Sequence, residues 1–427
     1  MLTKIDASNA IQLQEYLEGR SEDISSDIII KVTKILEDVK KNKDEAVHRY
    51  TKEFDGIDVE DLRVTQEEID ACAAKADDFF VESMKQAKAN IEFYHEAQKS
   101  RGYLLNKEQG IYLGQRVLPL DSVGIYVPGG RAQYPSSVLM NVIPAKIAGV
   151  KRIVMITPPS REGGLHPNIA AAARIAGIDE IYKVGGAQGI AALAYGTETI
   201  AKVDKIVGPG NIFVAAAKKL VFGKVDIDMI AGPSEILVIA DEGADPSYVA
   251  ADLLSQAEHD PLASAILVTT SQQVIDAVNE EVKKQCAQLP KKEIVTQSLR
   301  DYGKSILCDT LEEAIELSNA IAPEHLELMI ADPMQYLGLV KHAGSVFMGY
   351  HTCESIGDYF GGTNHVLPTS GTARFSSALG VDSFVKKSSF LHYTKEAIEA
   401  YGDQIIEMAE QEDLQAHANA VKVRLKK

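Results

Sequence analysis

Residues 121–149 read DSVGIYVPGGRAQYPSSVLMNVIPAKIAG, a short β-rich run followed by a glycine-containing turn and an amphipathic segment. The same order of run, turn and Ala-rich helical segment returns three more times before residue 224. The later units begin with KRIVMITPP (151–159), EIYKVGG (180–186) and DKIVGPG (204–210). Strands that alternate with crossover helices are typical of a parallel sheet. This stretch therefore predicts an α/β lobe, which we bound at residues 126–239.

A second alternating stretch follows, with strand-like runs SEILVIAD, SAILVTTS, KSILCDT and ELMIAD separated by helical segments. It predicts another Rossmann-like parallel-sheet lobe, built from residues 26–125 with 240–380. Residues 26–98 contribute apolar positions at helical spacing with no strand between them. A helical N-terminal arm (1–25) and a small helical C-terminal module (381–427) complete the expected α/β fold. A ligand commonly binds in the cleft between two such lobes.

Bulk composition narrows the class of protein. The 427 residues carry 61 acidic against 44 basic side chains, a net charge of −17. This disfavours nucleic acid and anionic membranes as partners, because both call for a basic face. The apolar runs are too short to span a bilayer, the N-terminus lacks a signal-peptide core, and the four cysteines form no CxxC pair. These features predict a cytoplasmic, reduced protein.

Glycine-rich turns recur where predicted strands end, in YVPGG (126–130), VGGAQG (184–189), VGPGN (207–211) and AGPS (231–234). Glycine permits close backbone approach, and a helix N-terminus offers free N–H groups to phosphate. No stretch fits GxGxxG, since Phe213 occupies the third glycine position of VGPGNIF. Ordinary tight turns and an unusual nicotinamide dinucleotide site both remain open.

Two polar pairs lie in the second half of the chain. Gln256 and His259, in DLLSQAEHDP, stand three residues apart at the predicted end of an amphipathic helix, where they share a face. APEHLEL sets Glu324 beside His325 after a proline. A carboxylate next to an imidazole can divide acid and base duties at neutral pH. An exposed helix start without a catalytic role is the alternative interpretation of Glu324 and His325.

Further polar residues follow. The segment 354–381 has little sustained periodicity, many small polar residues, and Asp358 and His365 within it. Long irregular segments in compact domains are usually functional. Glu412 and His417 lie on a predicted helix near the chain end, where a histidine is usually a solvated surface residue. Imidazole nitrogen and carboxylate oxygen suit zinc, but without an HExxH or CxxC motif the residues alone leave a metal site open.

Ordered motifs from about residue 26 to 424 resemble the histidinol dehydrogenase family. They are IYVPGGRAQYPSS, VGGAQGIAALAYGT, VGPGN, IAGPSEILVIAD, LLSQAEHD, APEHLEL, GDYFGGTNHVLPT and EDLQAHANAV. The resemblance implies a zinc-containing homodimer that uses NAD to oxidise L-histidinol through L-histidinal to L-histidine, the last step of histidine biosynthesis.

The resemblance also implies roles for individual residues. It assigns one zinc ion per subunit to the side chains of Gln256, His259, Asp358 and His417. Glu324 and His325 match the catalytic pair, with His325 as the base in alcohol oxidation and Glu324 activating water. The implied substrate contacts are Ser234, Gln256, His259, His325, Asp358, His365, Glu412 and His417. The implied NAD contacts are Tyr126, Gln188 and Asn211, each in one of the glycine turns.

The same resemblance implies that the C-terminal module completes the site of the partner subunit. One departure from the family is Cys353, where many relatives carry proline; no catalytic assignment depends on it. Two rival interpretations stand beside this one. A zinc- and NAD-dependent dehydrogenase of another small polar alcohol keeps the scaffold but changes the substrate. A non-catalytic protein that binds nucleotide or metal keeps the fold alone, and an NADH absorbance assay separates it from an enzyme.

Overall fold

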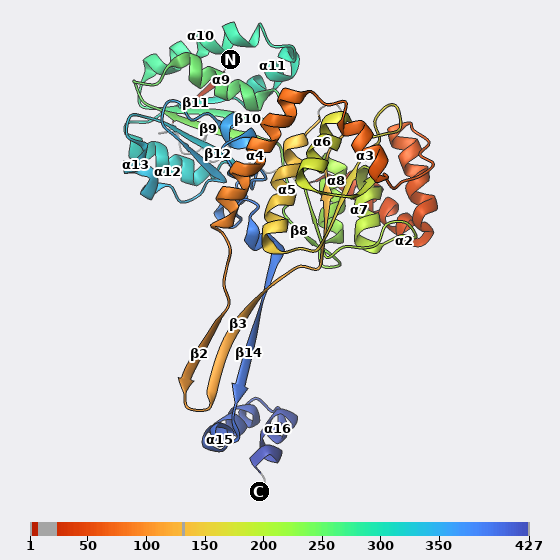
Figure 1. Cartoon of the computed structure of the whole chain (residues 1–427). Coiled ribbons are helices and arrows are strands. Elements are labelled where there is room, and N and C mark those ends of the chain that lie inside the picture. The colour runs from red at the N-terminus through yellow and green to blue at the C-terminus, as the bar shows by residue number, and fades with distance from the viewer. Residues whose placement is uncertain (1, 7–23, 130–132, 426–427) are drawn as a thin grey trace.

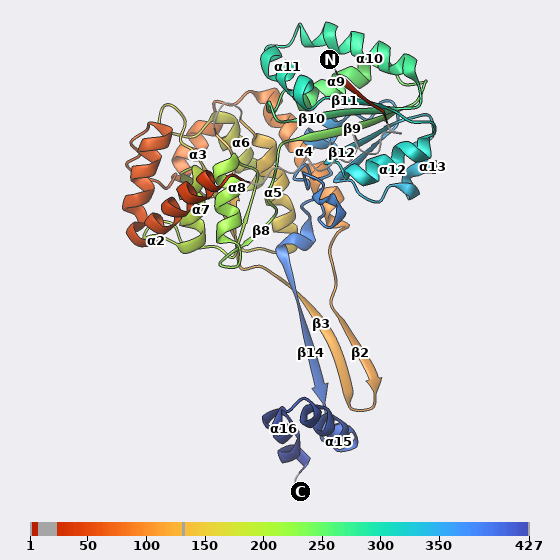
Figure 2. The ribbon, with the colours of Figure 1, turned by 180° about the vertical axis from the view of Figure 1, so that it is seen from behind.

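The computed structural model describes residues 2–6, 24–129 and 133–425 (Figure 1). Most of the expected N-terminal arm and Gly130 of the first glycine turn lie outside these ranges. Two α/β lobes lie side by side, and a narrow ribbon projects from them to a pair of helices at the C-terminus (Figures 1 and 2). The expected pair of parallel-sheet lobes is confirmed.

One of the two sheets has five parallel strands in the order β6-β5-β4-β7-β8. Its strands are β4 (Ser122–Tyr126), β5 (Arg152–Thr157), β6 (Glu180–Lys183), β7 (Lys205–Val207) and β8 (Asp226–Ile227). The helices that follow the first four strands are α5 (Pro135–Ala148), α6 (Pro167–Ala176), α7 (Gly186–Tyr195) and α8 (Ile212–Val221). All four strand–turn–helix units predicted from the sequence are present.

The other sheet has six parallel strands in the order β1-β11-β10-β9-β12-β13. Its strands are β1 (Thr3–Asp6), β9 (Glu235–Ala240), β10 (Ser264–Thr269), β11 (Lys304–Leu307), β12 (His325–Met329) and β13 (Ser345–Met348). Its helices are α9 (Pro246–Ala257), α10 (Gln272–Cys286), α11 (Lys292–Asp301), α12 (Leu311–Ile321), α13 (Pro333–Tyr336), η1 (Leu337–Leu339) and α14 (Glu354–Tyr359). Strand β1 corrects the expectation of a purely helical N-terminal arm, since its backbone extends the sheet beside β11.

Three helices precede the first hairpin, α2 (Ser26–Asp55), α3 (Gln66–Ala73) and α4 (Asp78–Glu96). Helix α2 packs on α7 and α8, α3 packs on α6, and α4 packs on α5. Their buried apolar side chains join the two cores of the five-stranded sheet, not those of the six-stranded sheet. The expected assignment of residues 26–125 to the lobe of residues 240–380 is therefore corrected for these helices.

The ribbon is a three-stranded antiparallel sheet that was not predicted from the sequence. It consists of β2 (Tyr103–Glu108), β3 (Ile111–Pro119) and β14 (Val385–Tyr393), with β3 in the centre. Short helices η2 (Thr372–Arg374) and η3 (Val381–Phe384) lead into β14, and α15 (Lys395–Gln411) and α16 (Gln415–Leu425) follow it. The C-terminal module thus contains a strand, β14, before its two longer helices. Within the described residues, no helix is both long and apolar enough to cross a membrane.

Candidate active site

Glu324 and His325 lie where helix α12 gives way to strand β12. Ala322 ends the helix in the left-handed region (φ 51°), and the chain then enters the buried strand directly. Both side chains are buried, so the alternative of an exposed helix start is wrong. The backbone N–H of Glu235 donates to Glu324 Oε2 at 2.9 Å, and His325 Nδ1 lies 2.9 Å from the Glu235 carbonyl oxygen. The neighbouring strand β9 therefore fixes the position of both side chains.

The electrostatics of this pair depend on burial and on its close neighbours. Burial raises the pKa of the Glu324 carboxyl, although His325 opposes the shift. Burial alone lowers the pKa of His325, but the carboxylates of Glu324 and Asp358 outweigh it and raise that pKa. His325 Nδ1 lies 3.7 Å from Glu324 Oε2, and its Nε2 lies 3.8 Å from Asp358 Oδ1. The pair thus has the environment typical of acid–base residues.

Asp358 comes from helix α14, whose first residue Glu354 faces the same way. Ligand atoms of His325, Glu354 and Asp358 all lie within 4.8 Å of one another, a spacing that can hold a metal ion. The sequence reading missed Glu354. Its signal was present, because Glu354 and Asp358 are four residues apart on one helix and therefore share a face.

Gln256 projects from the last turn of α9 and is 1% exposed. Among the residues that the structure describes, its side-chain oxygen and nitrogen have no hydrogen-bond partner. Helix α9 ends at Ala257, so His259 lies in the turn beyond it and not on the helix face that the sequence predicted. The His259 backbone N–H donates to the Gln256 carbonyl at 3.1 Å, which keeps the two residues together. By surface area the residue His259 is exposed; desolvation of its ring nevertheless lowers its pKa, a shift that the charge of Asp358 opposes.

His365 connects the two lobes beside Asp358. Its Nδ1 lies 3.0 Å from the Asp358 carbonyl oxygen, and its Nε2 lies 3.1 Å from Ser137 Oγ on helix α5. Ser137 was not singled out from the sequence. Ser234 directly precedes β9, the strand that holds Glu324 and His325, and its carbonyl accepts from the Ser264 N–H. Residues from both lobes therefore meet at this point.

The predicted nucleotide turns converge at the carboxyl ends of β4, β6 and β7. The Gly186 N–H lies 3.4 Å from the Tyr126 hydroxyl, and a Cβ placed on Gly186 would be 2.4 Å from Gln188 Oε1. At Gly208 (φ +112°) a Cβ would lie 2.1 Å from the Tyr126 carbonyl oxygen, so the two backbones touch. Asn211 caps helix α8 by accepting from the N–H groups of its first turn. The turns that carry Tyr126, Gln188 and Asn211 thus lie against one another.

Two predicted site residues are not brought to this place within one chain. Glu412 and His417 lie at the end of α15 and on α16, beyond the ribbon and far from both lobes (Figures 1 and 2). Both are exposed.

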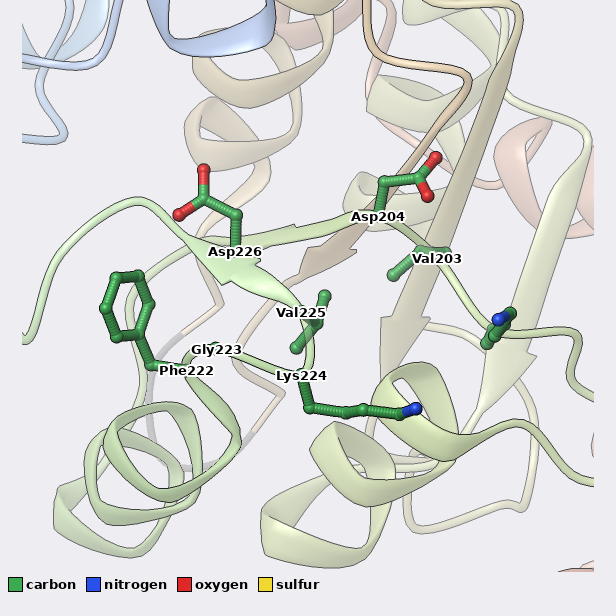
Figure 3. A pocket seen from close by; sticks show the side chains of 8 residues that line it. Val203, Asp204, Phe222, Gly223, Lys224, Val225 and Asp226 are labelled. Atoms are coloured by element: carbon green, nitrogen blue, oxygen red, sulfur yellow. The ribbon is translucent and has the colours of Figure 1, made fainter. Parts of the chain in front are cut away.

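A separate pocket of about 320 Å³ lies at the other end of the five-stranded sheet (Figure 3). It is lined by residues 202–204 and 222–226, which precede or begin β7 and β8. In open α/β sheets, ligands bind at the carboxyl ends of the strands. This pocket is at the amino ends and contains none of the predicted site residues.

Comparison with known proteins gives one consistent result. A family model described as histidinol dehydrogenase matches residues 18–425. A histidinol dehydrogenase from Clostridium acetobutylicum is 56% identical over 422 residues, 99% of this chain and 97% of its own length. One from Listeria monocytogenes is 56% identical over 92% of each chain. A crystal structure of histidinol dehydrogenase from Elizabethkingia anophelis matches with a TM-score of 0.94 at 43% identity, covering 99% of this chain and 98% of that one.

Proposed function

The chain belongs to the histidinol dehydrogenase family, and we propose that it oxidises L-histidinol through L-histidinal to L-histidine with NAD as the oxidant and zinc in its site. The observation that carries this proposal is the buried pair Glu324–His325, with His325 Nε2 3.8 Å from Asp358 Oδ1. Among described residues His325 Nε2 has no hydrogen-bond partner, so it is free to meet a substrate hydroxyl. The reaction is the last step of histidine biosynthesis.

The residues present fit a zinc ion. Gln256 has a buried amide whose two polar atoms find no partner among the described residues, and burying such atoms unpaired is costly. A metal bound by the amide oxygen would remove part of this cost. We propose that Gln256, His259 and Asp358 hold zinc together with the partner subunit's His417. The nitrogen and oxygen donors of this set are those that zinc accepts.

His325, Glu354 and Asp358 form a second possible ligand set that shares Asp358 with the first. We favour the first set because it leaves His325 available for proton transfer and gives a role to the unpartnered amide of Gln256. A bound zinc ion supplies a Lewis-acidic centre that orients the amino alcohol.

The first oxidation needs a base close to the substrate hydroxyl. We assign this role to His325, whose Nδ1 is engaged by the Glu235 carbonyl oxygen at 2.9 Å. That contact keeps the proton of the neutral ring on Nδ1 and leaves Nε2 as the acceptor. Because the carboxylates of Glu324 and Asp358 raise the pKa of His325, the ring must release its Nε2 proton before it acts as the base. His325 would take the hydroxyl proton at Nε2, and a nicotinamide held nearby would supply the hydride acceptor that the oxidation requires.

The second oxidation needs water. We assign Glu324 to accept a proton from the water that adds to the bound aldehyde, because one of its oxygens is fixed by the Glu235 N–H. Burial raises its pKa to about 8, so the carboxylate, once ionised, is a stronger base than an ordinary glutamate. A second NAD would supply the acceptor for the hydride that the hydrate must lose to become the carboxylate. Ser234, His365 and Glu412 remain proposed contacts to the substrate, with Glu412 contributed by the partner subunit.

The residues also fit a nicotinamide cofactor. Gln188 is 1% exposed, and its Oε1 has no hydrogen-bond partner among the described residues. The Tyr126 hydroxyl lies beside the same turn, 3.4 Å from the Gly186 N–H. We propose that Tyr126, Gln188 and Asn211 contact NAD where their three turns converge.

We further propose a homodimer in which each C-terminal module completes the site of its partner. The ribbon and the terminal helices expose many large apolar side chains, which is unusual for a free surface. They are Tyr103, Leu104, Leu105, Phe390, Leu391, Tyr401, Ile405, Met408, Leu414 and Val423. A second copy of the chain would cover these residues while bringing Glu412 and His417 to the opposite lobes. The four cysteines are unpaired, which suits the cytoplasm as the site of action.

The decisive test is stoichiometric. Purified protein with zinc should convert each histidinol to histidine with formation of two NADH, measured by absorbance and by analysis of the product, because each hydride transfer carries two electrons. One NADH with release of histidinal would contradict the four-electron proposal. Activity on another amino alcohol or diol in preference to histidinol would favour the rival substrate, and no NADH with any of them would favour a binding protein.

A further inference from the structure

A buried ion pair lies directly beneath the turn that carries Asn211. Lys218 of helix α8 and Asp228 after strand β8 are in contact, with side chains 3% and 1% exposed. Neither belongs to the proposed catalytic machinery. Burying two charges costs several kcal/mol, and well-packed apolar residues of similar size often serve stability as well. The pair therefore calls for a reason other than stability alone.

Both charged groups form hydrogen bonds with the backbone of one residue, Gly208. Lys218 Nζ donates to the Gly208 carbonyl oxygen at 2.9 Å, and the Gly208 N–H donates to Asp228 Oδ2 at 2.8 Å. The other Asp228 oxygen accepts from the Met229 N–H at 2.7 Å. The ion pair thus binds both the amide N–H and the carbonyl oxygen of a single glycine.

The sheet itself gives this turn little support. Strand β7 has 3 residues and β8 has 2. The β7–β8 ladder ends at Ile206 and Ile227, and the pairing of β7 with β4 ends at Val207, so neither ladder includes Gly208. Gly208 follows with φ +112°, a conformation that the ladder does not impose, and it touches the Tyr126 backbone. A residue that departs from extended geometry at the end of so short a strand needs other contacts to keep one conformation.

We propose that Lys218 and Asp228 are positioning residues for the cofactor: they hold the Gly208–Asn211 turn in its binding conformation before NAD arrives. The inference rests on the proposed use of NAD at Tyr126, Gln188 and Asn211. Holding the turn in advance spares the cofactor the cost of ordering it, and that saving appears as affinity. If loss of the pair left the turn competent about a tenth of the time, the apparent Kd for NAD would rise about tenfold.

The test uses the zinc-loaded full-length enzyme. Lys218→Met alone would leave the buried carboxylate of Asp228 without its charged partner. The main variant is therefore Lys218→Met combined with Asp228→Asn, which removes both charges and keeps a side-chain oxygen that accepts from the Gly208 N–H. NAD binding is measured by calorimetry, and KM for NAD, KM for histidinol and kcat are measured by NADH formation. The expected result is an increase of about tenfold in Kd and KM for NAD, with kcat at saturating NAD and KM for histidinol within about twofold. Lys218→Arg, which keeps the charge, should recover part of the affinity.

The chain offers a matched control in Lys205, a buried lysine on β7 paired at 2.9 Å with Asp226, a residue labelled in Figure 3. This pair lies at the opposite end of the strand, so Lys205→Met should leave KM for NAD unchanged. A folded double variant with wild-type affinity for NAD, or an equal loss of affinity for NAD and histidinol, would overturn the positioning role.

A second measurement needs no substitution and stays informative if the double variant does not fold. In the NAD-free wild-type protein, the Gly208 amide should already be protected from hydrogen exchange, because Asp228 accepts its hydrogen. Rapid exchange that slows only after NAD is added would overturn the proposal. A wild-type protein that binds no NAD at all would instead contradict the proposed function.

Discussion

The shared-site proposal can be tested by mixing two inactive variants. Asp358→Ala removes a ligand from the lobe, and His417→Ala removes one from the C-terminal module. In one chain these residues lie at opposite ends of the ribbon (Figure 1). If each site combines the lobe of one subunit with the module of the other, each variant homodimer has a defect in both sites and should be inactive.

The expected recovery follows from counting sites. In a two-fold symmetric heterodimer, one site pairs the Asp358→Ala lobe with the His417→Ala module and collects both defects. The other site pairs an intact lobe with an intact module. Equal mixing makes about half of the dimers heterodimers, each with one good site of two, so about a quarter of wild-type activity should return.

The assay is NADH formation from histidinol after the two variants are unfolded, mixed and refolded with zinc. Differently tagged chains allow heterodimers to be isolated, and these should reach about half of wild-type activity per dimer. Asp358→Ala mixed with Gln256→Ala is the matched control. Both of those defects lie in the same lobe, so every mixed dimer has one defect in each site and no activity should return. Verified heterodimers of Asp358→Ala and His417→Ala without activity would refute the shared site.

Three further outcomes are expected. Dialysis against a chelator should abolish activity and zinc should restore it; full activity in metal-free protein would remove the zinc assignment. Glu324→Gln should slow histidinal oxidation by about 10²–10⁴-fold and affect histidinol oxidation less, because the base for water is lost while an oxygen remains for the Glu235 N–H; equal losses measured on each substrate would argue against this role. Asp55 has a pKa raised to about 6 by burial, so its folded form stays protonated after the unfolded form has ionised near pH 4. Its contribution to stability is therefore lost as pH rises from about 4 to 6. Over that range the free energy of urea unfolding of Asp55→Asn should increase relative to that of the wild type by on the order of 1–3 kcal/mol. A difference between the two proteins that does not change with pH would contradict this prediction.

Sequence predicted the two parallel sheets well because their strands are buried on both faces. All six residues of β9 and of β10 are buried, and such strands appear as continuous apolar runs bounded by glycine and polar turns. The ribbon escaped prediction for the opposite reason. All six residues of β2 are exposed in the single chain, so no alternation of buried and exposed residues marks it as a strand. Helical periodicity in residues 26–96 predicts that each helix has an apolar face, but it does not indicate which of the two sheets that face covers.

The site was predicted mainly through family resemblance, and the structure shows which physical signals support it. Glu324 and His325 are adjacent in sequence, but the positions of their side chains are fixed by contacts with β9, which no sequence spacing reveals. The spacing of Gln256 and His259 suggested a shared helix face, but the helix ends before His259. Glu354 had a clear signal in its spacing from Asp358 and was overlooked. Only the three-dimensional structure shows which buried polar side chains lack a hydrogen-bond partner among the described residues, as the Gln256 amide does.

If the chain dimerises as proposed, its shape links completion of the site to assembly of the dimer. Within the described residues 385–425, only Ala397, Gly402 and Ala418 are buried. So little burial leaves β14, α15 and α16 with almost no core of their own, since burial of apolar surface is the main source of folding free energy. The ribbon carries Glu412 and His417 away from both lobes of their own chain, and both side chains are exposed there. A second copy would supply both the missing apolar contacts and the lobes that lack these two side chains. We infer that ordering the module and completing the metal site are one event, in which dimerisation stabilises the module and the module's imidazole closes the ligand set around Asp358.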